Sequence, residues 1–100
     1  MTKIEQVAPG HLMVSGQLNF DSVVMLREQG AALLKAAGSK CEIDLSGVTR
    51  AGSAGVSLLL SWLRYAAARE IKLVYSHLPA DLLGVARVSG IDQFLPTVSQ

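Results

Sequence analysis

Stretches that alternate polar and apolar residues predict the strands of this chain. Alternation over residues 3–7 predicts a short strand, residues 11–18 are typical of a second one, and Pro9-Gly10 between them predicts the tight turn of a hairpin. Three later stretches are typical of short strands, at residues 41–45, 71–76 and, around Pro96, 91–98.

Apolar residues at helical spacing predict three helices between these strands. The first, over residues 23–37, has Asn19 or Asp21 as its N-cap and Gly38 as its C-cap. The second begins near Ser53, which can cap it, and runs to about residue 69. The third covers residues 80–88 after Pro79. Residues 46–52 are expected to form a loop, with Val48 tucked into the core.

The order of these elements predicts an α/β fold. Strands that alternate with helices form mostly parallel sheets, so the expected sheet is mixed, opened by the N-terminal hairpin and packed with three to four helices. With 100 residues, of which 50% are hydrophobic, the chain can form one packed core. One domain over residues 1–100 is therefore expected.

The second helix has two apolar sides. The expected core stripe consists of Val56, Leu59, Leu60, Leu63 and Ala67. The opposite side carries Leu58, Trp62, Tyr65 and Arg69, with Ala54 and Ser61 at its edge. This second side is either covered by loops of the domain or offered to a partner. Trp, Tyr and Arg are enriched in interface hot spots, which favours the partner.

Composition and motifs exclude several classes of function. The net charge is +1 and there is no basic stripe, so nucleic acid is not an expected partner. A single cysteine, Cys41, is expected to be a core residue, and His11 and His77 belong to no set of metal ligands. No phosphate-binding glycine motif is present. We therefore expect a protein without enzymatic activity, metal or cofactor.

The N-terminal region and the hydropathy predict the location. The first residues lack the apolar core of a signal peptide. The longest uncharged apolar stretch, over residues 51–63, is too short to span a bilayer. A cytoplasmic protein without direct membrane insertion is expected.

The segment Asp-Leu-Ser-Gly-Val-Thr-Arg-Ala-Gly-Ser-Ala-Gly-Val, residues 44–56, resembles the central motif of STAS domains, which include the anti-sigma factor antagonists. Gly16-Gln17-Leu18 is similar to the Gly-x-Leu that ends the second strand of that family. The order of elements agrees along nearly the whole chain. The resemblance implies a single STAS domain.

The loop before the second helix departs from the antagonist pattern. Antagonists typically have Asp-Ser-Ser-Gly there, and a kinase phosphorylates the second Ser. The matching position here is Ala54, and Gly52 replaces the Asp, while Ser53 is retained. This loop resembles that of the STAS subunit (MlaB-like) of the Mla phospholipid ABC transporter, which has Asp-Thr-Gly-Gly. That subunit sits on the cytoplasmic ATPase and supports its assembly and activity.

The resemblance implies a regulatory subunit that binds the ATPase of a phospholipid transporter and, through it, a permease and a lipid-binding subunit. Such a subunit would lie at the cytoplasmic face of the inner membrane. The expected partner-binding residues are Gly52, Ser53, Ala54, Leu58, Ser61, Trp62, Tyr65 and Arg69. Ser53 is either a contact hydroxyl or a phosphorylation site.

Two alternatives remain at this point. The chain could be an antagonist-type signalling switch that binds a serine kinase. It could also be a STAS module that binds a small ligand or lipid in an apolar pocket.

Overall fold

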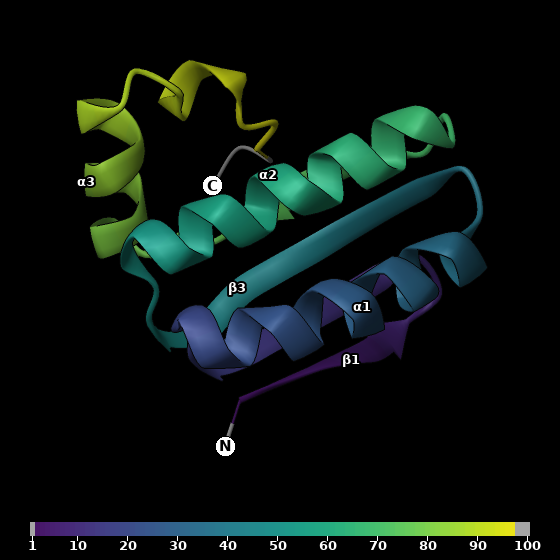
Figure 1. The fold of residues 1–100 in the computed structure, drawn as a ribbon. Coiled ribbons are helices and arrows are strands. Elements are labelled where there is room, and N and C mark those ends of the chain that lie inside the picture. The colour runs from purple at the N-terminus through teal and green to yellow at the C-terminus, as the bar shows by residue number, and fades with distance from the viewer. Residues whose placement is uncertain (1, 98–100) are drawn as a thin grey trace.

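A computed structural model describes residues 2–97 of the chain (Figure 1). Strands and helices alternate after an initial pair of strands. In chain order the elements are β1 (Lys3–Ala8), β2 (His11–Gln17), α1 (Phe20–Ala37), β3 (Lys40–Arg50), α2 (Gly52–Ala68), β4 (Lys72–Ser76), α3 (Ala80–Val88) and the 3-10 helix η1 (Asp92–Phe94).

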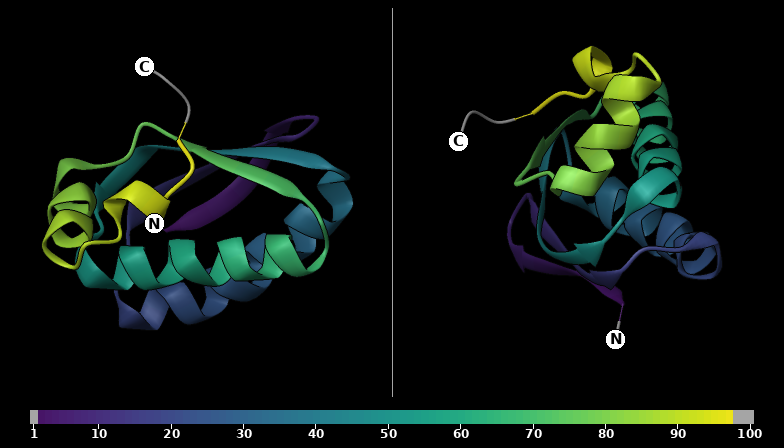
Figure 2. Two further views of the ribbon diagram at one scale, coloured as in Figure 1. Left: turned by 90° about the horizontal axis from the view of Figure 1, so that it is seen from above. Right: turned by 90° about the vertical axis from the view of Figure 1, so that its left-hand side faces the viewer.

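The sheet has the strand order β1-β2-β3-β4. β1 and β2 are antiparallel, whereas β2 pairs with β3, and β3 with β4, in parallel. This confirms the predicted α/β fold with a mixed sheet opened by a hairpin. α1 and α2 lie side by side on one face of the sheet, and α3 and η1 lie near the start of α2 (Figure 2).

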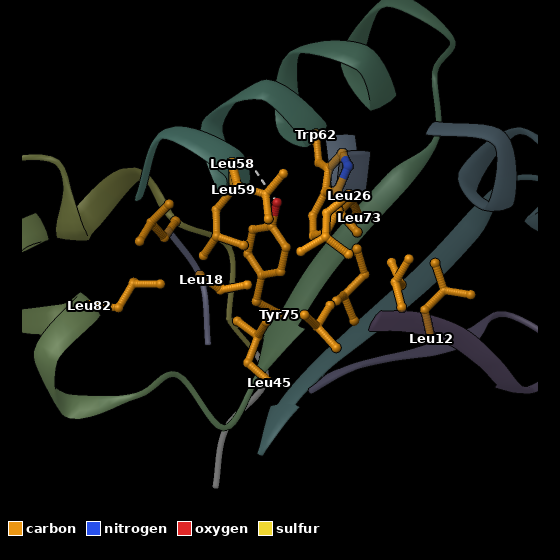
Figure 3. Close-up of a cluster of buried hydrophobic side chains, with 14 of the residues drawn as sticks. Leu12, Leu18, Leu26, Leu45, Leu58, Leu59, Trp62, Leu73, Tyr75 and Leu82 are labelled. Atoms are coloured by element: carbon orange, nitrogen blue, oxygen red, sulfur yellow. Dashed lines mark hydrogen bonds between the residues drawn. The ribbon is translucent and has the colours of Figure 1, made fainter. Parts of the chain in front are cut away.

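Residues along each strand alternate between the helix-covered face of the sheet and its open face. Apolar side chains on the covered face form the core with the two helices. They include Leu12, Val14, Ile43, Leu45, Leu73 and Tyr75, all at most 5% exposed. The Tyr75 hydroxyl donates a hydrogen bond of 2.6 Å to the Leu59 carbonyl, so its one polar atom is satisfied inside the core (Figure 3).

The start of α1 matches the cap expected from the sequence. The Asn19 side chain accepts hydrogen bonds from the amides of Asp21 and Ser22, at 3.0 and 2.9 Å. The Ser22 hydroxyl accepts from the Asn19 amide in return, which completes a capping box. Gly38 ends the helix with a φ of 90°, a conformation that glycine adopts without strain.

The loop expected from Ser46 onward is wrong. β3 continues to Arg50 because these residues pair with the end of β2, where Ser15 is the partner of Gly47 and Gln17 is the partner of Arg50. The register shifts along this part of the pair, which accommodates the Ser46-Gly47 step inside a strand. Val48 is half-buried against the core, as expected.

The last strand, expected at residues 91–98, differs as well. The structure has the single turn η1, followed by an isolated parallel bridge between Tyr75 and Thr97. The Tyr75 amide donates to the Pro96 carbonyl at 2.8 Å. This short segment therefore lies along the outer edge of β4. The end of the predicted strand, Val98, lies outside the described residues.

The rotation of α2 about its axis differs from the one expected. Trp62 and Leu58 are 0% and 2% exposed and point into the core, so their placement on an exposed face is wrong (Figure 3). α1 covers them. The Trp62 indole N–H donates to the Arg27 carbonyl of α1 at 3.3 Å.

The expected core stripe is only partly buried as a result. Val56 and Leu59 belong to the core, but Leu60 and Leu63 are half-buried and Ala67 is exposed. The buried face of α2 is centred between the two stripes seen in the sequence, because the helix packs against both the sheet and α1. It consists of Ala54, Gly55, Val56, Leu58, Leu59, Trp62 and Ala66.

We predict that Gly30→Ala destabilises the protein. A Cβ at Gly30 would overlap the Trp62 ring, so the ring or one of the two helices must move. Overpacking of this kind costs about 1–3 kcal/mol of unfolding free energy, measurable by urea denaturation. The control is Gly84→Ala in α3, where no atom lies within 4 Å of the new Cβ. That change should raise stability by roughly 0.5 kcal/mol. Equal effects would contradict the predicted clash.

Candidate functional site

Residues 51–54, which we call the motif loop, lie where β3 ends and α2 begins. Ala51 joins the two elements, and the residues expected to form a loop, Gly52 to Ala54, are instead the first turn of α2. Gly52 is the first residue of α2 and has a φ of 54°, a left-handed conformation suited to glycine. Ser53 follows with an exposed side chain, whereas Ala54 is only 5% exposed. The one hydroxyl of the motif loop that faces solvent is therefore that of Ser53.

Ser53 does not cap α2, contrary to one expectation from the sequence. The N-cap residue is Ala51, which has no side chain that can accept a hydrogen bond. The cap comes instead from α3. The Asp81 carboxylate accepts from the amides of Ala51 and Gly52 through Oδ2, at 2.8 and 3.1 Å.

Asp81 ties the starts of two helices together. Its second oxygen, Oδ1, accepts from the amide of Leu82 in the first turn of α3, at 2.9 Å. Free amides and the helix dipole favour a negative charge at both places. Asp81 is not among the site residues predicted from the sequence. Its position in the first turn after Pro79 was a signal that it caps α3, but nothing local to it pointed to α2, which begins 29 residues earlier.

Small residues let α3 approach this loop closely. A Cβ at Gly55 would lie 2.7 Å from Ala51 Cβ and 3.0 Å from Leu82 Cδ1, so only glycine fits there without movement. Ala54, the residue before it, is also buried. The backbone around Ser53 is thus fixed by packing and by the Asp81 cap.

The solvent side of α2 continues from Ser53 along the helix. We call this surface the α2 outer face; its members are exposed or half-buried and comprise Ser53, Ser57, Leu60, Ser61 and Arg64. It contains short polar side chains and one leucine. The short serine side chains allow another protein element to approach the helix closely.

The expected partner-binding residues divide into two groups. Ser53 is exposed, and Gly52, Ser61 and Tyr65 are half-buried, so a partner can reach them. The exposed Arg69 stacks on Tyr65, with Cζ 3.9 Å from the ring centroid. Three of the predicted residues, Ala54, Leu58 and Trp62, are buried and cannot contact a partner.

The Ser53 hydroxyl has no visible activating group. Among the hydrogen bonds of residues 2–97, none involves its side chain. A nucleophilic serine needs an adjacent base, and no His side chain is paired with this one. The arrangement can offer a hydroxyl to a partner or to a modifying enzyme.

A second polar cluster lies on the open face of the sheet. Asp44 Oδ1 accepts from the Ser46 amide at 2.8 Å and lies 3.2 Å from His77 Nδ1. Burial alone would raise the pKa of Asp44, but the hydrogen bonds from Ser46 and the neighbouring His77 lower it below the usual value. His77 has a φ of 56°, which is uncommon outside glycine, at the turn between β4 and α3.

Chemistry at the remaining candidates is limited. Cys41 is buried, and desolvation, helped by the nearby Glu42, raises the pKa of its thiol to about 11, so it stays protonated and unreactive. Within residues 2–97, no group of three or more His, Cys, Asp or Glu side chains could hold a metal ion. No helix in that part of the chain is both long and apolar enough to cross a membrane.

Asp81→Ala should loosen the loop. We expect a loss of about 1 kcal/mol of stability, typical of a lost cap, and faster hydrogen exchange at the amides of Ala51 and Gly52. The control is Asp21→Ala, which removes the first-turn aspartate of α1. That variant should leave exchange at Ala51 and Gly52 unchanged. Unaltered exchange at both amides in Asp81→Ala would show that the cap does not hold the loop.

Asp44 should make stability depend on pH. Because its folded-state pKa is lowered, its contribution is full above the unfolded value of about 3.8 and is lost as the pH falls through the folded value. Wild type should therefore be more stable than Asp44→Asn at pH 7, and the difference should shrink by pH 3. Urea denaturation at both pH values measures it, with Glu28→Gln as an exposed control on α1. A difference that is constant with pH would refute this role.

Comparison with solved structures shows the same fold in bacterial regulators. The anti-sigma factor antagonist SpoIIAA in its unphosphorylated form is 16% identical and has a TM-score of 0.72, over 100% of this chain and 90% of the other. An anti-sigma factor antagonist from Mycobacterium paratuberculosis is 20% identical with a TM-score of 0.73, over 100% and 86%. A STAS domain protein from Planctomyces limnophilus is 22% identical with a TM-score of 0.69, over 99% and 89%.

Comparison with curated protein sequences finds no match. The family comparison is more informative, because the model described as "Mlab, STAS domain" matches residues 1–97. That match covers the hairpin, the motif loop and all three α-helices. The chain therefore belongs to the STAS domain family.

Proposed function

We propose that this protein is a non-catalytic subunit that binds the cytoplasmic ATPase of an ABC-type phospholipid transport system and supports its assembly and activity. The contact would use Ser53 and the rest of the α2 outer face. The observation that carries the proposal is the arrangement at the motif loop: an exposed hydroxyl at Ser53 next to a buried, hydroxyl-free Ala54.

This arrangement favours a constitutive contact over a phosphorylation switch. The position that kinases modify in similar antagonists is Ala54, which can accept no phosphate. The neighbouring Ser53 keeps the loop polar where a partner would touch it. The loop is also held rigid by Asp81, and a preformed surface loses little entropy on binding.

The contact surface differs from the one that the sequence alone suggested. Leu58 and Trp62 are excluded by burial, and Ser57, Leu60 and Arg64 take their place beside Ser53 and Ser61. The short side chains of Ser53, Ser57 and Ser61 would let a partner helix pack closely, and Arg64 would fix its register by pairing with an acidic group.

Affinity purification tests the partner. The tagged chain would be recovered from detergent-solubilised native cells and its companions identified by mass spectrometry. We expect an ABC ATPase with its permease and a lipid-binding subunit. Ser57→Arg should abolish recovery of the ATPase, because a long charged side chain would separate the two surfaces. Ser89→Arg, the same change at an exposed position after α3, should leave recovery unchanged. Loss in both variants, or in neither, would contradict the proposed surface.

A second candidate function is an antagonist-type switch that binds a serine kinase. The exposed hydroxyl of Ser53 at a helix start supports it, because an added phosphate would be favoured there by the helix dipole. Recovery of a serine kinase or sigma-factor regulator, together with one phosphate that Ser53→Ala removes, would favour the switch. Recovery of the ATPase with unmodified Ser53 would exclude it.

A further inference from the structure

A cavity of about 570 Å³ lies at the end of the sheet opposite the α2 N-terminus. The turn between β1 and β2, the end of α1 and the first residues of β3 and β4 surround it. Its volume falls within the range of small-molecule sites. None of the proposed partner-binding residues lines it.

Two lysines stand next to each other in this cavity. Lys40 opens β3 and Lys72 opens β4, and they are register partners in the parallel pair, so their side chains leave the same face of the sheet. Neighbouring strands lie about 4.8 Å apart, which brings the two stems close together. Like charges directly opposite each other on a sheet are destabilising. An anion between the two ammonium groups would remove this repulsion.

The carboxylate that lines the cavity forms no ion pair with these lysines. Glu42 is the one carboxylate among the residues that line the cavity, and its Oε1 lies 3.9 Å from His11 Nδ1. Within residues 2–97, neither Lys40 nor Lys72 lies in an ion pair. The cavity is therefore lined by two lysine ammonium groups and one carboxylate, an excess of positive charge.

The rest of the lining suits a ligand with a small organic part. Ser39 adds a hydroxyl donor beside the lysines, and Pro9, Ala37 and Val74 provide apolar walls. A phosphate oxygen array accepts hydrogen bonds from several ammonium groups at once, as two adjacent lysines would offer. A lone inorganic anion would leave the apolar walls unused.

We propose that this cavity binds a small phosphate monoester, with the phosphate between Lys40 and Lys72. The ligand is either a soluble phosphorylated metabolite or the phosphate headgroup of a lipid at a membrane surface. The site does not depend on the proposed partner, because it lies at the other end of the sheet.

Titration of the full chain, labelled with ¹⁵N, with glycerol 3-phosphate at constant ionic strength tests the site. The expected chemical-shift changes centre on the amides of Gly10, Ser39 and Cys41. The double variant Lys40→Gln/Lys72→Gln should weaken binding at least tenfold while keeping the dispersion of the wild-type spectrum. Lys3→Gln is the matched control, because Lys3 lies on the open face of the sheet but at its other end. It should change the affinity less than twofold.

Stability gives a second and independent readout. Lys72→Glu replaces a like-charge pair by an opposite-charge pair, so it should raise Tm in phosphate-free buffer and abolish the rise that glycerol 3-phosphate produces in wild type. A lower Tm in that buffer would contradict the repulsion between the two lysines. Shifts confined to the α2 N-terminus, or equal losses in Lys3→Gln and the double variant, would overturn the proposal.

Vesicles distinguish the two sources of phosphate. Sedimentation with vesicles that contain phosphatidic acid, but not with pure phosphatidylcholine vesicles, would assign the site to a lipid headgroup, provided that the double variant no longer sediments. Binding of glycerol 3-phosphate without sedimentation would assign it to a soluble metabolite. Absence of both would refute the site.

Discussion

Trp62 lies against Gly30, and this contact between α2 and α1 sets the arrangement of the helical layer. Any side chain at Gly30 would overlap the indole, and the indole N–H is anchored on the Arg27 carbonyl. The pair fixes both the distance between the helices and the rotation of α2 about its axis. Because α2 cannot rotate, the side chains that it presents to solvent are fixed as well. Ser53 and the outer face therefore depend on a contact made on the far side of the same helix.

The motif loop is held in a similar indirect way. Asp81 belongs to α3, yet it accepts hydrogen bonds from the amides of Ala51 and Gly52 at the start of α2, and Leu82 packs against Gly55 one turn into that helix. α3 in turn is positioned by the turn after β4, where His77 contacts Asp44. The surface at Ser53 is thus supported by residues from β3, α2 and α3, and a change in any of these elements alters it.

The fold was largely predictable from local patterns, because strand alternation, the Asn19 cap and Gly38 each act within a few residues. The extension of β3 was not, since the pairing of Gly47 and Val48 with β2 depends on a strand far away in the sequence. The helical wheel of α2 correctly gave two apolar sides. The helical wheel does not show that α1 covers the side with Trp62. That contact depends on the missing side chain at Gly30 in another helix, and in a hydrophobic pattern glycine looks like any other small residue.

The site was predicted in part. Ser53 and Tyr65 are accessible, as expected, whereas the role of Asp81 was not predictable, because it caps a helix that begins 29 residues earlier.

Gly55 has a consequence for how relatives of this chain can be compared. The glycine is required by Leu82 and Ala51, and by nothing that involves a phosphate or a hydroxyl. A lineage that abandoned phosphorylation would therefore still keep this glycine, as long as its third helix docked in the same place. If this glycine is invariant across a family, its conservation would then reflect the packing of the third helix. The mode of regulation would have to be inferred from the two positions just before the glycine, where packing leaves the choice of residue partly open.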